Sequence, residues 1–427
     1  MWKARYNIAH LILLVLVILI AGCNDQATIT KSDSDAKTDQ SRIGYGRSET
    51  TSELDEAPDW DQFLADILAA EQAERQAMAD SFITLLEDSE DYGFPLTVEN
   101  QCVYLFTAGY SSVQVPGDHN NWTPSADPMS RIPGTDLFYR EKTYELDARL
   151  DYKFVTPGDN WILDPRNPRQ VTGGYGPNSE LAMPDYVDPW EIEYNPDIPH
   201  GTLESFQFTS DSLNNSRGVK VYLPAGYDPE GAYPAIYVHD GGEYVSLASM
   251  KNTLDNLIDA ELIEPVIAVF VNPINRMTEY WLNEPFKWMF VNELVPYIDS
   301  NYPTDPQPAA RAVMGCSLGG LTSVYFAHNH PDVFGYAGGH SSAVYVNNNE
   351  LINDIAADDP TDVVYYLDAG TYEASIYQSS TALKDVLEGK GNSVTWQVWH
   401  EGHSWGAWRA HTDNILQTFF STSGVKE

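Results

Sequence analysis

Five short apolar or β-branched runs, separated by segments long enough for helices, constrain the fold of the second half of this chain. The runs cover residues 235–239, 266–271, 312–315, 363–367 and 394–399. Continuously apolar strands that alternate with helices are typical of a mostly parallel sheet with both faces covered. We therefore predict an α/β domain over residues 200–423.

A pentapeptide of the form G-x-S-x-G joins one of these runs to a helical stretch. Gly315-Cys316-Ser317-Leu318-Gly319 follows the third run and precedes residues 321–329. A sharp turn from strand to helix raises a serine hydroxyl above the sheet, and the helix N-terminus behind it favours developing negative charge. We interpret Ser317 as a nucleophile; the alternative is a glycine-rich turn with a surface serine.

A serine hydroxyl needs a base, which in a parallel sheet of this kind comes last, in the chain order serine, acid, histidine. His403 lies just beyond the final run, at the edge of the sheet expected for Ser317. We predict that His403 is the base. The loop after residues 363–367 offers two acids, and we favour Glu373, which lies farther out on the loop, over Asp368.

A tetrahedral oxyanion needs backbone N–H donors. One is the N–H of the residue after the nucleophile, Leu318, and the other is expected in the loop His239-Asp240-Gly241-Gly242-Glu243. We predict Gly242 as this second donor, with a simple tight turn as the alternative. The sequence shows no cluster of Cys and His with metal-ligand spacing, so we expect no metal and no cofactor.

The first residues predict export. Lys3 and Arg5 precede an apolar run that ends in Ile20-Ala21-Gly22-Cys23, which resembles the bacterial lipoprotein box. We expect a signal peptide over residues 1–22, lipidation of Cys23 and anchoring to a bacterial membrane, on its periplasmic side or at the cell surface. Ordinary cleavage beside a chance cysteine is the alternative.

Three segments with different residue patterns lie between the signal peptide and the α/β domain. Residues 23–57 are polar and predict a flexible tether, and residues 58–92 have helical spacing. Residues 93–190 alternate short strand-like runs with turn residues, which predicts a small immunoglobulin-like β-sandwich. Cys102 and Cys316 fall in different domains, so we expect no disulfide between them.

The formal net charge is −38, which argues against negatively charged partners. Residues 1–22 hold two basic and no acidic side chains, so their removal would leave −40. Because like charges repel, such a chain disfavours nucleic acid and polyanionic substrates.

Four motifs in order resemble the enterochelin-esterase-like family of α/β-hydrolases, which includes the feruloyl and acetyl-xylan esterases of carbohydrate esterase family one. They are YVHDGGEY, GCSLGG, LDAGTYE and EGHSWGAW. The resemblance implies an α/β-hydrolase fold, an oxyanion donor at Gly242 and the acid at Glu373. The family's usual Gly-Gly-His is Glu401-Gly402-His403 here, which keeps the histidine.

Upstream, VPGDHNNW, YKF, WILDP and GPN resemble the glycogen-binding type of carbohydrate module. The resemblance places glucan-binding roles on Trp122, Lys153, Trp161 and Asn178, although such sandwiches also serve as purely structural modules.

Together these patterns predict a serine carboxylic-ester hydrolase that acts through an acyl-enzyme on feruloyl or acetyl esters of saccharides. A catecholate-siderophore esterase, and a carbohydrate-binding lipoprotein with an inactive hydrolase domain, are the two alternatives.

Overall fold

An eight-stranded sheet organises the second half of the chain in the computed structural model, which describes residues 57–422. The strand order is β10-β11-β13-β12-β14-β15-β16-β17. All neighbours from β13 to β17 pair in parallel, whereas β10 and β11 are antiparallel additions at one edge. The predicted α/β class with a mostly parallel sheet is therefore confirmed.

The strands of this sheet are β10 (Thr202–Ser210), β11 (Asn215–Leu223), β12 (Ala235–His239), β13 (Ile267–Val271), β14 (Arg311–Cys316), β15 (Tyr336–His340), β16 (Val364–Gly370) and β17 (Val394–Trp399). The helices that follow or connect them are α4 (Gly241–Ser246), α5 (Met250–Asp259), α6 (Arg276–Glu279), α7 (Glu284–Met289), α8 (Val295–Asn301), α9 (Leu318–Asn329), α10 (Val346–Ala357), α11 (Ala374–Gly389) and α12 (Trp405–Phe420).

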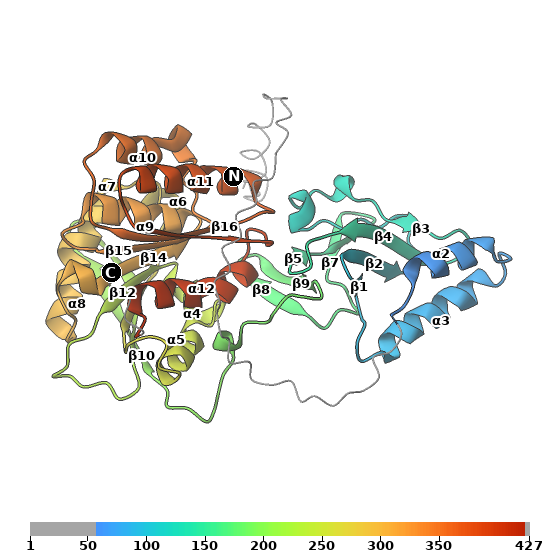
Figure 1. Ribbon diagram of the computed structural model, residues 1–427, viewed down its shortest axis with the longest axis horizontal. Helices are drawn as coiled ribbons and strands as arrows, with labels where there is room; N and C mark the ends of the chain where they lie inside the picture. Colours follow the sequence, from blue (N-terminus) through green and yellow to red (C-terminus); the bar gives the residue numbers. More distant parts are fainter. Residues whose placement is uncertain (1–56, 423–427) are drawn as a thin grey trace, which may run out of the picture. The chain divides into compact units, whose positions relative to one another are not determined.

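Successive residues of the central strands face two separate apolar cores. In β12, Tyr237 belongs to one core and Ile236 and Val238 to the other, as expected for side chains that alternate across a strand. Helices α9, α10 and α11 cover the first face, and α4, α5 and α12 cover the second (Figure 1). A strand between two apolar layers must be apolar at every position, which explains the five continuous runs.

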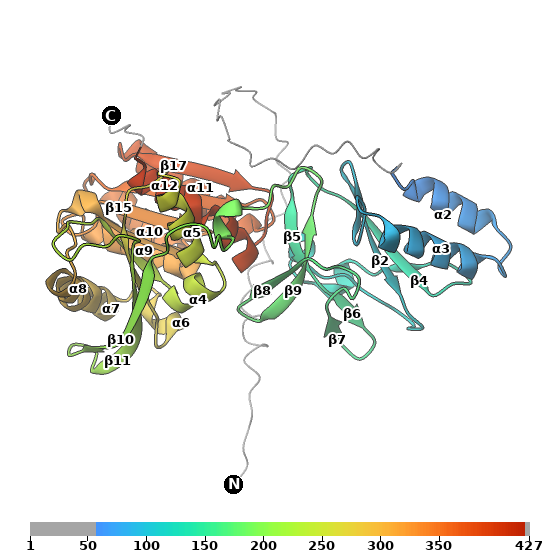
Figure 2. The same cartoon turned by 90° about the horizontal axis from the view of Figure 1, so that it is seen from below.

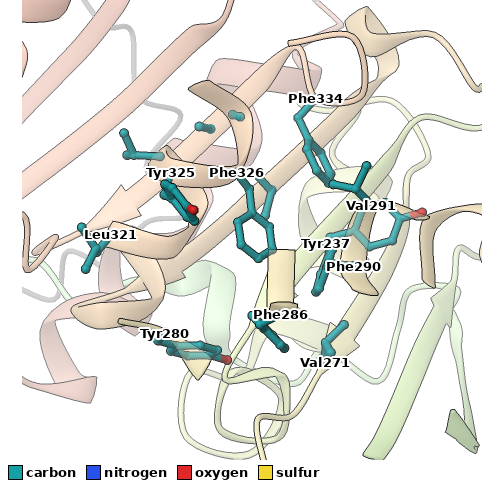
Figure 3. Close-up of a cluster of buried hydrophobic side chains, with 14 of the residues drawn as sticks. Tyr237, Val271, Tyr280, Phe286, Phe290, Val291, Leu321, Tyr325, Phe326 and Phe334 are labelled. Atoms are coloured by element: carbon teal, nitrogen blue, oxygen red, sulfur yellow. The ribbon is translucent and has the colours of Figure 1, made fainter. Parts of the chain in front are cut away.

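The first core fixes the helix that follows the G-x-S-x-G turn. Phe326 of α9 lies among Tyr237, Phe286, Phe290 and other buried side chains (Figure 3). Its ring is 5.3 Å from that of Phe290, at an interplanar angle of 63°. Such edge-to-face contacts add to the apolar burial and hold α9 firmly behind the turn.

The residues before the large sheet form a β-rich region. Its strands are β1 (Leu96–Val98), β2 (Gln101–Thr107), β3 (Ser130–Arg131), β4 (Leu137–Thr143), β5 (Arg149–Tyr152), β6 (Phe154–Thr156), β7 (Asn160–Ile162), β8 (Gln170–Gly173) and β9 (Gly176–Ala182). They form sheets in the orders β1-β2-β4-β3, β5-β9-β8 and β6-β7.

Strand β2 is buried on both sides because two layers cover it. Tyr104 and Phe106 pack against residues of β5 and β6, while Val103 and Leu105 pack against α2 (Trp60–Ala69) and α3 (Arg75–Asp88). Figure 2 shows these two helices beside β2 and β4. The segment 58–92 thus supplies a layer of helices to the β-rich region.

Several predictions fall outside the described residues, namely the signal peptide 1–22, the lipidated Cys23 and all but the last residue of the tether 23–57. Within residues 57–422, no helix combines the length and the apolar character that a membrane span requires. Cys102 and Cys316 are buried free thiols.

Candidate active site

Ser317 occupies the turn between β14 and α9 in a conformation that non-glycine residues rarely adopt. Its φ is 57° and its ψ −119°. The backbone is so crowded here that a Cβ on Gly315 would lie 2.7 Å from the carbonyl carbon of Gly319. The glycines of the motif therefore permit the turn, and the rigid strand and helix on either side hold the strained serine.

His403 reaches this serine from the loop between β17 and α12. Its Nε2 lies 2.9 Å from Ser317 Oγ. Ser404 begins α12 by accepting the N–H of Ala407, and Trp408 of the same helix meets the His403 ring edge to face at 4.9 Å. The start of the last helix thus supports both the position and the orientation of the imidazole.

Glu373 contacts the other side of the imidazole. Its Oε2 lies 2.6 Å from His403 Nδ1. Its Oε1 accepts hydrogen bonds from Ser341 Oγ and from the backbone N–H of Gly370, each at 2.6 Å. The carboxylate is buried and is held by these three contacts, so it can keep the ring in one tautomer and stabilise an imidazolium.

Asp368, the alternative acid, lies elsewhere in the network. Its carboxylate accepts the N–H of Ser341 and lies 2.7 Å from Nδ1 of His340, a histidine that is itself fully buried. Burial alone would raise the pKa of Asp368, but the charge and hydrogen bond of His340 outweigh it and lower that pKa. The structure thus brings Glu373, and not Asp368, to His403.

The two predicted oxyanion donors differ in their present partners. Leu318 is the first residue of α9, so its N–H has no carbonyl within the helix. The N–H of Gly242 donates to Asn272 Oδ1 at 2.7 Å. An ion pair between Asp240 and Arg276, at 2.8 Å, fixes the turn that carries Gly242.

Sequence reasoning misses two residues of this site, Asn272 and Ser341. Each directly follows a strand at this edge of the sheet, and that position is the signal that could have indicated them.

The four residues matched to a carbohydrate module form two groups. Trp122 and Trp161 stack with ring centroids 6.4 Å apart and an interplanar angle of 26°, and Trp161 is partly exposed. Asn178 donates to Asp151 at 2.9 Å. Lys153 is half-buried, which lowers its pKa, while the charge of Asp151 acts in the opposite direction.

The tryptophans near the site in sequence are only partly available to a ligand. Trp405 and Trp408 belong to the second core, whereas Trp281 and Trp288 are exposed. The indole N–H of Trp281 donates to Asn347 Oδ1 at 2.9 Å. Within residues 57–422, no group of three or more His, Cys, Asp or Glu side chains could hold a metal ion.

Comparisons with known proteins agree with this architecture. Residues 210–419 match the family model described as "Putative esterase". The chain is 26% identical over 367 residues to iron(III) enterobactin esterase of Escherichia coli O6:H1, covering 76% of this chain and 86% of the relative. It is 28% identical over 244 residues to an endo-1,4-beta-xylanase/feruloyl esterase of Xylanibacter ruminicola, covering 53% of this chain and 32% of that relative.

The solved structure of ferric enterobactin esterase from Salmonella typhimurium is similar in fold. It superposes with a TM-score of 0.66 at 23% sequence identity, covering 75% of this chain and 93% of that one. Its coverage extends beyond the large sheet into the β-rich region. Residues 210–419 thus match an esterase family model, and their mostly parallel sheet with helices on both faces has the α/β fold of this solved structure.

Proposed function

We propose that this chain is a serine carboxylic-ester hydrolase with Ser317 as nucleophile, His403 as base and Glu373 as orienting acid. The observation that carries the proposal is the line of two hydrogen bonds through one imidazole, 2.9 Å to Ser317 and 2.6 Å to Glu373. A base that is hydrogen-bonded to the nucleophile and oriented by a third group is the arrangement that serine hydrolysis requires.

In the proposed reaction, His403 Nε2 takes the proton of Ser317 as Oγ attacks the ester carbonyl. The N–H groups of Leu318 and Gly242 stabilise the tetrahedral oxyanion, with the Gly242 donor transferring from Asn272 Oδ1 to the substrate oxygen. His403 then protonates the leaving alcohol, leaving an acyl-Ser317. The same imidazole activates water, which releases the acid and restores the serine.

We propose an acyl ester of a saccharide, feruloyl or acetyl, as the substrate. The net charge of −38 disfavours a polyanion. Two arginines that contact neighbours of the triad in the chain are already paired, Arg276 with Asp240 and Arg149 with Asp151 and Glu180. The exposed Trp281 and the stacked pair Trp122–Trp161 offer aromatic faces that suit a sugar or cinnamoyl ring.

A catecholate-siderophore esterase is the second candidate. The match to iron(III) enterobactin esterase spans 76% of the chain, whereas the match to the feruloyl esterase relative spans 53%. The β-rich region, proposed as an immunoglobulin-like carbohydrate module with Trp122, Lys153, Trp161 and Asn178 as its contacts, thus has a counterpart in a siderophore enzyme. Export and lipid anchoring through Cys23 complete the proposal for a membrane-bound enzyme.

Specificity constants separate these candidates. We expect residues 24–427 to hydrolyse methyl ferulate or an acetylated sugar with a kcat/KM at least about tenfold higher than that for a ferric triscatecholate lactone, because the described site offers aromatic faces and few free cations. A clear preference for the lactone would reassign the protein to the siderophore candidate. Hydrolysis of none of the three, with retained glycan binding, would favour the carbohydrate-binding lipoprotein.

A further inference from the structure

The loop that carries His403 packs against the β-rich region. Strand β5 runs beside this loop, and the N–H of Arg149, its first residue, donates to the carbonyl of His400 at 3.1 Å. Arg149 also forms a parallel bridge with Glu401. The loop that follows β17 is therefore paired with a residue some 250 positions earlier in the chain.

The side chain of Arg149 extends the contact to the residue after the base. It is completely buried, and its Nη1 donates to Ser404 Oγ at 3.2 Å. The rest of the guanidinium is held by Asp151 at 2.6 Å and Glu180 at 2.7 Å. Because two carboxylates fix the planar guanidinium, its remaining N–H groups point toward the loop that carries His403.

Two glycines on either side of His403 make this packing close. A Cβ on Gly406 would lie 1.9 Å from Arg149 Nη2, and a Cβ on Gly402 would lie 2.3 Å from Cγ of Asp118, another residue of the β-rich region. Only glycine lets the loop approach both side chains. The backbone around the base is thus shaped by residues outside the hydrolase domain.

The loop that carries the acid is held by the same region. The hydroxyl of Tyr372, the residue before Glu373, donates to Glu145 Oε2 at 2.7 Å. The N–H of Tyr372 donates to the carbonyl of Glu401 at 3.2 Å, which joins the acid loop to the base loop. The loops that carry Glu373 and His403 are therefore both held by contacts with the β-rich region.

We propose that Arg149 is a positioning residue for His403, and that the β-rich region is a working part of the hydrolytic site in addition to any glycan contact. The proposal rests on the proposed function, because it assigns Arg149 a role only if His403 is the base. Its physical basis is that proton transfer from Ser317 depends on the 2.9 Å contact, and a displacement of about 1 Å can cost about 100-fold in rate.

Arg149→Lys tests the proposal, because lysine keeps the charge but loses the fork that reaches Ser404. In the full-length chain we expect kcat to fall about 10- to 100-fold with KM within about twofold, and the rate of phosphonylation of Ser317 by a fluorophosphonate to fall in parallel. The matched control is Arg169→Lys. Arg169 also binds Glu180, at 2.8 Å, but in the described part of the chain no hydrogen bond or ion pair joins it to residues 400–406, so kcat of this variant should change less than about twofold.

Gly406→Ala provides a second, independent variant. The added methyl group must displace the guanidinium of Arg149, so kcat should fall here too. In the double variant with Arg149→Lys, the smaller ammonium group relieves the overlap with the added methyl group. Gly406→Ala should therefore lower kcat less in the Arg149→Lys background than in the wild type.

An unchanged kcat and labelling rate in folded Arg149→Lys, accompanied only by a lower melting temperature, would reduce Arg149 to a structural role and overturn the proposal. If Arg149→Lys does not fold, unchanged labelling of folded Gly406→Ala would overturn it equally. Full activity of Ser317→Ala would contradict the proposed function itself, and that result does not depend on the role of Arg149.

Discussion

Ser317→Ala is expected to lower kcat for ester hydrolysis by about four to six orders of magnitude while the fold is retained. The substitution removes the hydroxyl that lies 2.9 Å from His403 Nε2, so the proposed acyl-enzyme cannot form. Background hydrolysis then depends on the oxyanion donors alone. Initial rates with an activated ester, together with circular dichroism of both proteins, measure the effect.

Ser323→Ala is the matched control for this substitution. Ser323 lies in the same helix, α9, and its hydroxyl donates to the carbonyl of Gly319 one turn earlier. Its loss should change kcat by less than about threefold, because such back-bonding is not needed by the helix. Activity of Ser317→Ala close to that of the wild type, in a preparation free of contaminating esterase, would remove the basis of the catalytic assignment.

Glu373→Gln is expected to have the second largest effect, a loss of about 100- to 10,000-fold in kcat. The glutamine amide keeps the size of the side chain but cannot stabilise the imidazolium. Its NH2 group also disturbs the orientation of the His403 ring. The Ser341 and Gly370 donors to Oε1 make the effect larger, because they hold the side chain where an amide is poorly matched.

Asp368→Asn separates the two candidate acids, since Asp368 lies within β16 and Glu373 lies beyond its end. Asp368 contacts His340 and not His403, so this variant should keep kcat within about tenfold of the wild type and lose stability instead. The pKa of Asp368 is lowered in the folded state, so its contribution to stability is present above its unfolded pKa and is lost as the pH falls below it. A larger kcat loss in Asp368→Asn than in Glu373→Gln would reverse the assignment.

The central strands could be predicted from the sequence because burial on both faces leaves an unbroken apolar run. Strands β12 and β17 have the predicted limits, and β14 extends its predicted run by one residue at each end. Strands β13 and β16 begin one residue later than predicted, and β16 continues three residues further. Strand β15 could not be found this way, since Tyr336-Ala337-Gly338-Gly339-His340 reads as a turn. Its glycines are required by packing: a Cβ on Gly339 would lie 2.2 Å from Ser342 Oγ.

The candidate site was accessible to sequence reasoning because each residue follows a strand, and parallel strands end at one edge of the sheet. The contacts of Arg149 with Ser404 were not, because residues so far apart in the chain carry no common local pattern. The bond between Gly242 and Asn272 was missed for a related reason, since a backbone N–H gives no indication in the sequence of which side chain accepts it.

Covalent labelling tests the central claim most directly. The wild-type protein is incubated with a fluorophosphonate, and its intact mass and its peptides are measured. The proposed chemistry predicts one adduct per chain, located on Ser317, absent from Ser317→Ala and formed at least about 100-fold more slowly in His403→Ala, because the serine then lacks its base. An adduct on another residue, or equal labelling of Ser317→Ala, would contradict the assignment of Ser317 as the nucleophile.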